Sequence, residues 1–212
     1  MYIPNQFEVS DPARLAAVMR QNSFATIVTN SHDGLLASHV PVLFFPDRGP
    51  RGVLAAHVAR ANPHWRHFRG DKEVLIIFHG PHGYISPNWY KTRPAVPTWN
   101  YVAVHAYGFP RLMEQERELS ALLQATIEKY ESALPNPWKA ELPEDFKSKM
   151  MQAIVGFEIE VTRLEGKFKL GQNRPPEDIA GAAETLEGSQ NQIDRELAAL
   201  MLSEQPIKRV QH

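Results

Sequence analysis

The chain has 212 residues, of which 43% are hydrophobic, and its formal net charge at pH 7 is −1. A chain of this length can bury a full core, so we expect essentially one domain. It contains no run of eighteen apolar residues and no charged-then-apolar leader, so we expect neither a membrane span nor a signal peptide. Cysteine is absent, which excludes disulfides, thiolate nucleophiles and cysteine-ligated metals and is compatible with a cytoplasmic location.

Strand patterns crowd into the first half of the chain. Asp11-Pro12 opens a short helix that ends near Asn22. An Asp-Gly pair that ends at Gly34 is a hairpin signal between two apolar runs. A long aromatic loop is predicted from Pro81 to Pro97. The predicted strands are residues 24–29, 35–45, 53–59, 74–79, 98–107 and 154–162.

Helical periodicity dominates the second half, where we predict helices over residues 114–132, 142–151, 176–186 and 192–202. The last predicted strand alternates, with Val155, Phe157, Ile159 and Val161 facing inward. Strands joined by short hairpins, with helices at the edges, favour a small antiparallel β-barrel of mainly β, α+β class. A parallel sheet would need a helix between every pair of strands.

The segment His57-Val-Ala-Arg-Ala-Asn-Pro-His-Trp65 has the pattern of an anion site. It ends a strand, places Asn62 as a helix cap and Pro63 at the first helical position, and sets Arg60 beside that helix start. First-turn N–H groups and an arginine together suit a phosphate. The structural alternative is an ordinary capped helix with a surface arginine.

Basic residues concentrate in the middle of the chain. Residues 48–113 carry nine basic and two acidic side chains, so the segment balance is +7. Six of the nine histidines and three of the four tryptophans also fall there, which favours an anionic aromatic ligand or a nucleic acid. Alternatively, these charged side chains lie on opposite faces of the folded protein and form no common site. The basic residues are Arg48, Arg51, Arg60, Arg66, Arg69, Lys72, Lys91, Arg93 and Arg111.

Other site chemistries have weak support. The pairs His79/His82 and His64/His67 have a spacing that metals accept, yet no cysteine or convincing carboxylate completes either set, so we predict no metal. Ser86 lies outside any nucleophile elbow, which disfavours a hydrolase. No Rossmann glycine pattern or Walker motif is present. The helices after residue 114 are acidic and no helix-turn-helix is evident, so no sequence motif supports nucleic acid binding.

Several segments resemble one family. They are His57–Trp65, Gly80-Pro-His-Gly-Tyr-Ile-Ser-Pro-Asn-Trp-Tyr90, Val96-Pro-Thr-Trp-Asn-Tyr101, Gly166-Lys-Phe-Lys-Leu-Gly-Gln-Asn173 and the opening Met1-Tyr-Ile-Pro-Asn-Gln-Phe7. Together they are similar to the signature segments of the PaiB-type, FMN-binding negative transcriptional regulators.

The resemblance implies an FMN-binding split β-barrel, related in fold to pyridoxamine-phosphate oxidases, in a homodimer with FMN at the subunit interface. The family is associated in bacteria with repression of sporulation and of protease production. We expect a split-barrel domain over residues 1–187 and a C-terminal helix and tail over 188–212. One departure is Gly171, where the family pattern leads us to expect serine; a serine hydroxyl that contacted the cofactor would be missing here.

Through this resemblance the anion site becomes the candidate FMN phosphate site, with the charge from Arg60 and directed hydrogen bonds from Asn62. We expect Ser38, His57 and Ala59 on one side of the isoalloxazine ring, and Trp89, Trp99 or Tyr101 covering it from the partner subunit. A second polar cluster is either a set of cofactor ligands or a solvated strand edge. It consists of Lys167, Lys169, Gln172 and Asn173.

Two functions from different classes remain open at this point. One is an FMN-binding regulator without turnover of its own, and the other is a flavin-dependent oxidoreductase, such as a flavin reductase or a pyridoxamine-phosphate-oxidase-like enzyme. Bleaching of a yellow protein by NAD(P)H would favour the enzyme. A colourless or redox-inert protein would favour the regulator.

Overall fold

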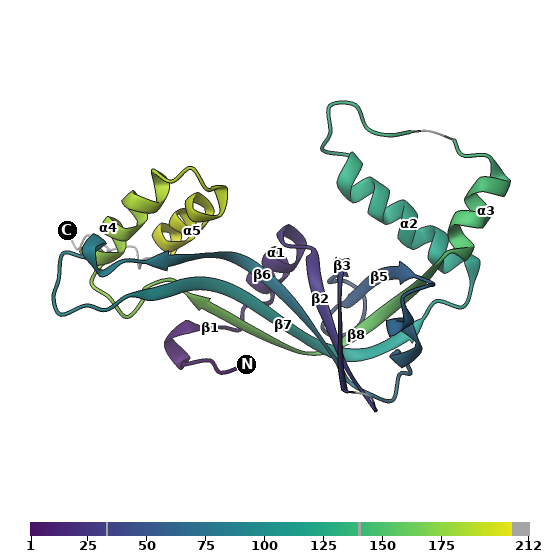
Figure 1. Cartoon of the computed structure of the whole chain (residues 1–212), viewed down its shortest axis with the longest axis horizontal. Coiled ribbons are helices and arrows are strands. Elements are labelled where there is room, and N and C mark those ends of the chain that lie inside the picture. The colour runs from purple at the N-terminus through teal and green to yellow at the C-terminus, as the bar shows by residue number, and fades with distance from the viewer. Residues whose placement is uncertain (33, 140, 205–212) are drawn as a thin grey trace. The chain divides into compact units, whose positions relative to one another are not determined.

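One mainly antiparallel sheet of eight strands organises the chain (Figure 1). The computed structural model describes residues 1–32, 34–139 and 141–204. Across the sheet the strand order is β3-β2-β6-β7-β8-β5-β4, and β1 pairs with β8. The strands are β1 (Glu8–Val9), β2 (Phe24–Ser31), β3 (Gly34–Pro41), β4 (Leu43–Phe45), β5 (Val53–Ala59), β6 (Val74–Ile85), β7 (Thr98–Leu112) and β8 (Ile154–Lys169).

Helices flank this sheet, as the periodicity predicts. The α-helices are α1 (Pro12–Gln21), α2 (Glu116–Glu131), α3 (Glu144–Gln152), α4 (Pro176–Glu187) and α5 (Gln192–Ser203). Three short 3-10 helices are η1 (Asn5–Phe7), η2 (Pro63–His67) and η3 (Pro87–Trp89). The bounds of α1 and β5 agree with the prediction to within a residue.

The chain divides into two compact units, and the long strands β6, β7 and β8 contribute to both. Unit 1 contains Met1–Val18, His79–Val104 and the chain from Glu165 onward. Unit 2 contains Met19–Phe78 and His105–Leu164. The predicted boundary between residues 187 and 188 is a different division, and it stays a prediction.

The core of unit 2 lies between its strands and beneath α2 and α3. The predicted alternation in β8 is confirmed, since Val155, Phe157, Ile159 and Val161 are all at most 7% exposed. On the other face of the sheet, Leu119 and Leu122 of α2 pack with Ala55, Leu43 and Met151. Unit 2 therefore buries apolar side chains on both faces of β5.

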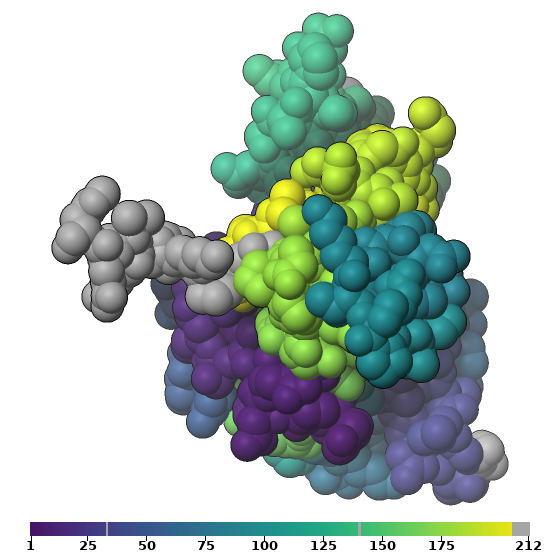
Figure 2. All heavy atoms as spheres, turned by 90° about the vertical axis from the view of Figure 1, so that its left-hand side faces the viewer, coloured from purple at the N-terminus to yellow at the C-terminus, as the bar shows by residue number. Residues whose placement is uncertain are grey.

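In unit 1, α4 and α5 pack side by side, and Ala182, Ala183, Leu197 and Ala198 are completely buried. Helix α4 also lies against η3, so the loop between β6 and β7 is covered by the C-terminal helices. Figure 2 shows this teal loop beside the yellow-green helices.

Several sequence predictions of strand length were wrong, since the strand expected over 98–107 continues to Leu112 and the strand expected over 154–162 continues to Lys169. The single strand expected over 35–45 is two strands, because Pro41 has no N–H and the Val42 N–H donates to Ser23 O outside the strand ladder. The loop expected from Pro81 begins only after Ile85. Glycine and proline suggested a turn there, but Gly80 lies within β6, where a Cβ would come 2.9 Å from the Cβ of Val102.

A buried carboxylate fixes the loop that follows η3. Asp178 in the first turn of α4 is 0% exposed, and its Oδ1 accepts hydrogen bonds from Lys91 N at 2.8 Å and Thr92 N at 2.9 Å. Its Oδ2 accepts one from the Thr92 hydroxyl, and Arg174 lies 4.0 Å away. Burial raises the pKa of Asp178, but these hydrogen bonds and Arg174 outweigh it, so the pKa is lowered overall.

We expect Asp178→Asn to lower the free energy of unfolding by about 2 kcal/mol at pH 7, because charge-assisted hydrogen bonds are lost. A lowered pKa in the folded state stabilises the fold above the unfolded pKa, and this contribution disappears as the pH falls through the folded value. The difference between variant and wild type should therefore shrink at low pH. Urea denaturation between pH 7 and pH 3 measures it.

The matched control is Glu177→Gln, which neutralises an exposed carboxylate one residue away in the same helical turn. It should change stability by less than about 0.5 kcal/mol. Equal effects of the two variants would contradict a specific role for Asp178.

Candidate functional site

A hydrogen-bonded group in unit 2 lies at the centre of the predicted anion site. The predicted cap is confirmed, since Asn62 Oδ1 accepts a hydrogen bond from His64 N at 3.0 Å. Asn62 Nδ2 donates to Ser38 Oγ at 3.0 Å, and Ser38 Oγ lies 2.8 Å from His64 Nδ1. His64 Nε2 is 2.8 Å from the Thr29 hydroxyl. The helix that follows the cap is the single 3-10 segment η2.

This group, the Ser38–His64 network, joins three elements that are far apart in the sequence. Ser38 belongs to β3, Thr29 to β2, and Asn62 and His64 to the segment that follows β5. Strand β3 is the end strand of the sheet and lies close to β5 without an intervening ladder. Side-chain hydrogen bonds therefore hold a junction that backbone pairing leaves open.

His64 is a neutral, structural histidine in this arrangement. It is 2% exposed, and burial, followed by the nearby His67, lowers its pKa. Both of its ring nitrogens already have partners, and its ring packs on Phe68 at 5.1 Å. The sequence showed His64 only as part of a weak metal pair. Among the described residues, no group of three or more histidine or carboxylate side chains is placed to hold a metal.

Arg60 is exposed, and one edge of its guanidinium donates hydrogen bonds to two backbone carbonyls. Its Nε donates to Gln152 O at 2.6 Å and its Nη2 to Ile154 O at 2.9 Å, while its backbone N–H donates to Ala153 O at 2.8 Å. A cation is favourable at the end of α3, where the carbonyls carry partial negative charge. Within the described part of the chain Nη1 makes no hydrogen bond, so the end of the guanidinium can still donate.

His57 and Ser38 lie on opposite faces of the sheet. In β5, His57 is on the same face as Ala55, which packs under α2. The Ser38–His64 network instead connects through Phe68 to Phe157, which lies 4.5 Å from Phe68 and pairs with Ala56 on the other face. His57 is half-buried, and burial lowers its pKa. The expectation that both residues lie on one side of the isoalloxazine ring stays a prediction.

Aromatic and basic side chains gather in unit 1. Tyr84 makes edge-to-face contacts with Trp89 and Trp99, with ring centroids 6.4 and 6.3 Å apart. Trp99 is 55% exposed, and Lys169 donates to its carbonyl at 2.6 Å. Lys167 lies 5.1 Å above the ring of Tyr101.

The two lysines lie on the same face of β8, two residues apart. Lys169 has a lowered pKa because it is partly buried and close to Lys167. Lys167 donates to Tyr2 O. Lys167 is only 7% exposed, so Lys169 is the more accessible of the two positive charges.

Gln172, in the second polar cluster, uses its side chain to hold the backbone turn that precedes it. Gln172 Oε1 accepts from Leu170 N at 2.8 Å and its Nε2 donates to Phe168 O at 2.6 Å, while Asn173 is exposed. Gly171 has φ +90, a conformation that serine adopts only under strain. Glycine at this position therefore suits the backbone of this chain.

The twelve predicted cofactor residues are divided between the two units. Ser38, His57, Ala59, Arg60 and Asn62 belong to unit 2. Trp89, Trp99, Tyr101, Lys167, Lys169, Gln172 and Asn173 belong to unit 1. Sequence reasoning missed Thr29, because its contact with His64 joins residues 35 positions apart.

Comparison with solved structures confirms the split-barrel fold. The chain is similar to the flavocytochrome Anf3 from Azotobacter vinelandii, with a TM-score of 0.61, 12% identity and coverage of 82% of this chain and 75% of that one. It is also similar to a FAD and heme binding protein from Mycobacterium smegmatis, with a TM-score of 0.59, 14% identity and coverage of 82% and 78%. No helix in the described part is long and apolar enough to cross a membrane.

Sequence comparison gives the family. The family described as "Putative FMN-binding domain" matches residues 1–163. The "Protease synthase and sporulation protein PAI 2" of Bacillus subtilis is 38% identical over 203 residues, which cover 95% of this chain and 96% of that protein. An uncharacterised protein of Emericella nidulans is 32% identical, with coverage of 79% and 82%. The chain therefore belongs to the PaiB-type family of FMN-binding split-barrel proteins.

Proposed function

We propose that this chain is an FMN-binding homodimer that acts as a regulatory protein in the manner of its relative PAI 2, whose name refers to protease synthesis and sporulation. Family membership supports the cofactor. The observation that carries the proposal is Arg60, an exposed guanidinium held by two carbonyls along one edge and able to donate from the other.

The phosphate of FMN would bind at the free end of the Arg60 guanidinium. Fixing one edge lowers the entropy that the side chain loses on binding, so the remaining N–H groups are oriented before the ligand arrives. A cavity beside Arg60 is also lined by Glu114 and Glu116, whose carboxylates disfavour an anion. We therefore place the phosphate on the side toward Asn62 and Ser38.

The isoalloxazine ring needs a flat apolar surface with some polar contacts, and the residues of unit 1 fit that need. Trp99 and Tyr84 offer exposed rings, and Lys169 offers a positive charge beside them. We propose that these groups come from the second subunit. Bound FMN would supply electron-transfer chemistry, while the protein residues bind and orient it.

We expect Arg60→Ala to weaken FMN binding about 10- to 100-fold, the range that one or two charge-assisted hydrogen bonds contribute. Riboflavin has no phosphate, so its affinity should change less than about threefold. Fluorescence quenching titrations of both ligands measure this difference.

Riboflavin also controls for the second role of Arg60 at the end of α3, because a general distortion would weaken both ligands alike. Arg66→Ala, which removes a neighbouring exposed arginine from η2, should leave both affinities unchanged. Equal losses of affinity for FMN and riboflavin in Arg60→Ala would show that Arg60 does not bind the phosphate.

Dimerisation and FMN binding should be linked if the site is shared. A ligand that binds only the dimer stabilises it by about 2.7 kcal/mol when its free concentration is 100 times its dissociation constant. We expect Trp99→Ala to weaken FMN binding and to raise the dimer dissociation constant together. Light scattering across a dilution series, with and without FMN, measures the second quantity.

The matched control is Trp138→Ala, because Trp138 is 44% exposed and belongs to unit 2, whereas the aromatic group belongs to unit 1. It should leave both quantities unchanged. A wild-type chain that is monomeric at micromolar concentration would refute the homodimer, and loss of FMN from a Trp99→Ala dimer of normal stability would place the site within one subunit.

We further propose that any effect on transcription is indirect and that the protein acts in the cytoplasm. The first turn of α2 carries Glu116 and Glu118, which would be repelled by a nucleic acid backbone. We expect the FMN-loaded dimer to show no specific DNA shift and no NAD(P)H turnover. A specific shift would make the regulation direct, and catalytic bleaching of the flavin by NAD(P)H would favour the oxidoreductase.

A further inference from the structure

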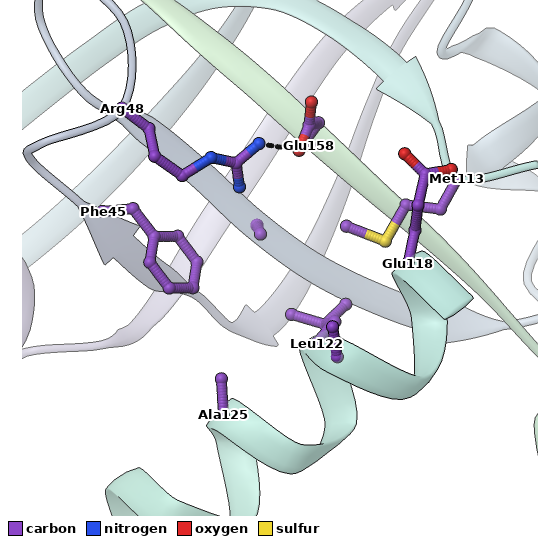
Figure 3. Close-up of a pocket in the computed structure, with 9 residues that line it drawn as sticks. Phe45, Arg48, Met113, Glu118, Leu122, Ala125 and Glu158 are labelled. Carbon is purple, nitrogen blue, oxygen red and sulfur yellow. Dashed lines mark hydrogen bonds and ion pairs between the residues drawn. The ribbon is translucent and has the colours of Figure 1, made fainter. Parts of the chain in front are cut away.

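A cavity of about 280 Å³ lies in unit 2, between α2 and the sheet, and takes no part in the proposed FMN site. Figure 3 shows Phe45 and Arg48 on one side of it and Leu122 and Ala125 of α2 on the other. The cavity is partly open to solvent, so a small molecule can enter it.

Small residues on facing elements keep the cavity open. Ala55 of β5 forms part of the sheet side, and Ala121 and Ala125, one turn apart on α2, form the helix side. Each of these side chains ends at Cβ, so none reaches across the gap.

The helix cannot simply collapse into the space, because its first turns are already seated on the sheet. Gly156 of β8 allows this close packing, since a Cβ there would come 2.8 Å from Met113 Sδ and 2.9 Å from Leu119 Cδ1. The hollow runs along the same helix from Glu118 to Ala125, and Met113 lines it as well. It is therefore a consequence of where the alanines lie along α2.

The mouth of the cavity carries a balanced set of charges. Glu158 accepts hydrogen bonds from Arg48 and Arg111, both at 2.8 Å, and Glu118 accepts one from Arg111 at 2.7 Å. Burial raises the pKa of Glu158, but its arginine partners lower it further, so it remains a carboxylate at neutral pH. Two positive and two negative groups leave no net charge.

Arg48 has more N–H donors to spare than Arg111, whose guanidinium uses four of its five. Arg111 donates from Nε, Nη1 and Nη2, to Glu158, Leu112 O and Glu118. Arg48 donates from Nη2 to Glu158, which is its only side-chain hydrogen bond among the described residues. Its guanidinium lies 5.6 Å from the ring centroid of Phe45 and is half exposed. It can therefore donate to a ligand acceptor at the mouth.

We propose that this cavity binds a small, neutral aromatic molecule with one carbonyl-type acceptor. The ring packs among Phe45, Ala55 and Ala125, with Met113 as an adaptable neighbour. The acceptor receives a hydrogen bond from Arg48. The ligand is neutral because a charge added beside the balanced quartet would be left without a partner. This site is separate from the proposed FMN site and does not depend on it.

Benzamide is a suitable probe, with benzoate and benzamidine as charged analogues of the same shape. In methyl-resolved NMR spectra of the full chain, we expect benzamide to shift the methyl signals of Ala55, Ala125 and Met113 at millimolar concentration. Benzoate and benzamidine should bind at least tenfold more weakly. Absence of these shifts, or equal binding of a charged analogue, would overturn the proposal.

Variants test the location. Ala125→Leu fills the cavity and should abolish the shifts, whereas Gln124→Leu adds the same side chain at an adjacent exposed position and should not. Ala121→Leu, also at an exposed position on the lining, gives a second filled variant should Ala125→Leu fail to fold. Retained binding in a folded, filled variant would overturn the site.

Arg48→Gln should weaken benzamide about tenfold, as expected for one hydrogen bond from a charged donor. Arg51→Gln removes an exposed arginine three residues away that does not line the cavity, and should leave binding unchanged. Equal effects of the two substitutions would show that Arg48 does not donate to the ligand.

Discussion

The hydrogen bonds among Ser38, Asn62, His64 and Thr29 are the constraint on which the arrangement of unit 2 depends. Backbone ladders hold most of the sheet, but β3 and the segment after β5 meet through side chains alone in this group. A buried imidazole left without these partners would cost on the order of 1–3 kcal/mol for each unpaired group. The network therefore explains why β3 stays next to η2.

The same network determines what the neighbouring residues can do. Because Ser38 Oγ already contacts Asn62 and His64, its main role in the structure is to hold the corner in shape, with spare capacity for one further contact. Arg60 leaves the corner beside Asn62 and ends on the carbonyls that follow α3. Arg60, the candidate ligand of the phosphate, is thus held by the carbonyls at the end of α3 and lies two residues from Asn62 of the network.

Balanced charges recur in both units, with different consequences. In unit 1, the carboxylate of Asp178 is saturated by the loop that it holds. In unit 2, Glu158 is saturated by two arginines, one of which keeps free donors beside an apolar cavity. Each unit thus contains a carboxylate whose oxygens are hydrogen-bonded by residues of the same unit.

The sequence predicted features that depend on local pattern, such as α1, β5, the Asn62 cap and the buried side of β8. It could not predict features set by long-range contacts. Gly80 suggests a turn until its closeness to Val102 is known. The sheet faces on which His57 and Ser38 lie also depend on the register between distant strands, which the sequence does not give.

The resemblance supplied the family and the identity of the cofactor. The residues alone indicated only that the ligand is an anionic aromatic molecule or a nucleic acid. The position of the phosphate is the central claim that follows. A crystal structure of the full chain with FMN tests it most directly. We predict phosphate oxygens within hydrogen-bond distance of the Arg60 guanidinium, on the side toward Asn62. A phosphate bound elsewhere, with Arg60 still donating only to Gln152 and Ile154, would contradict the account.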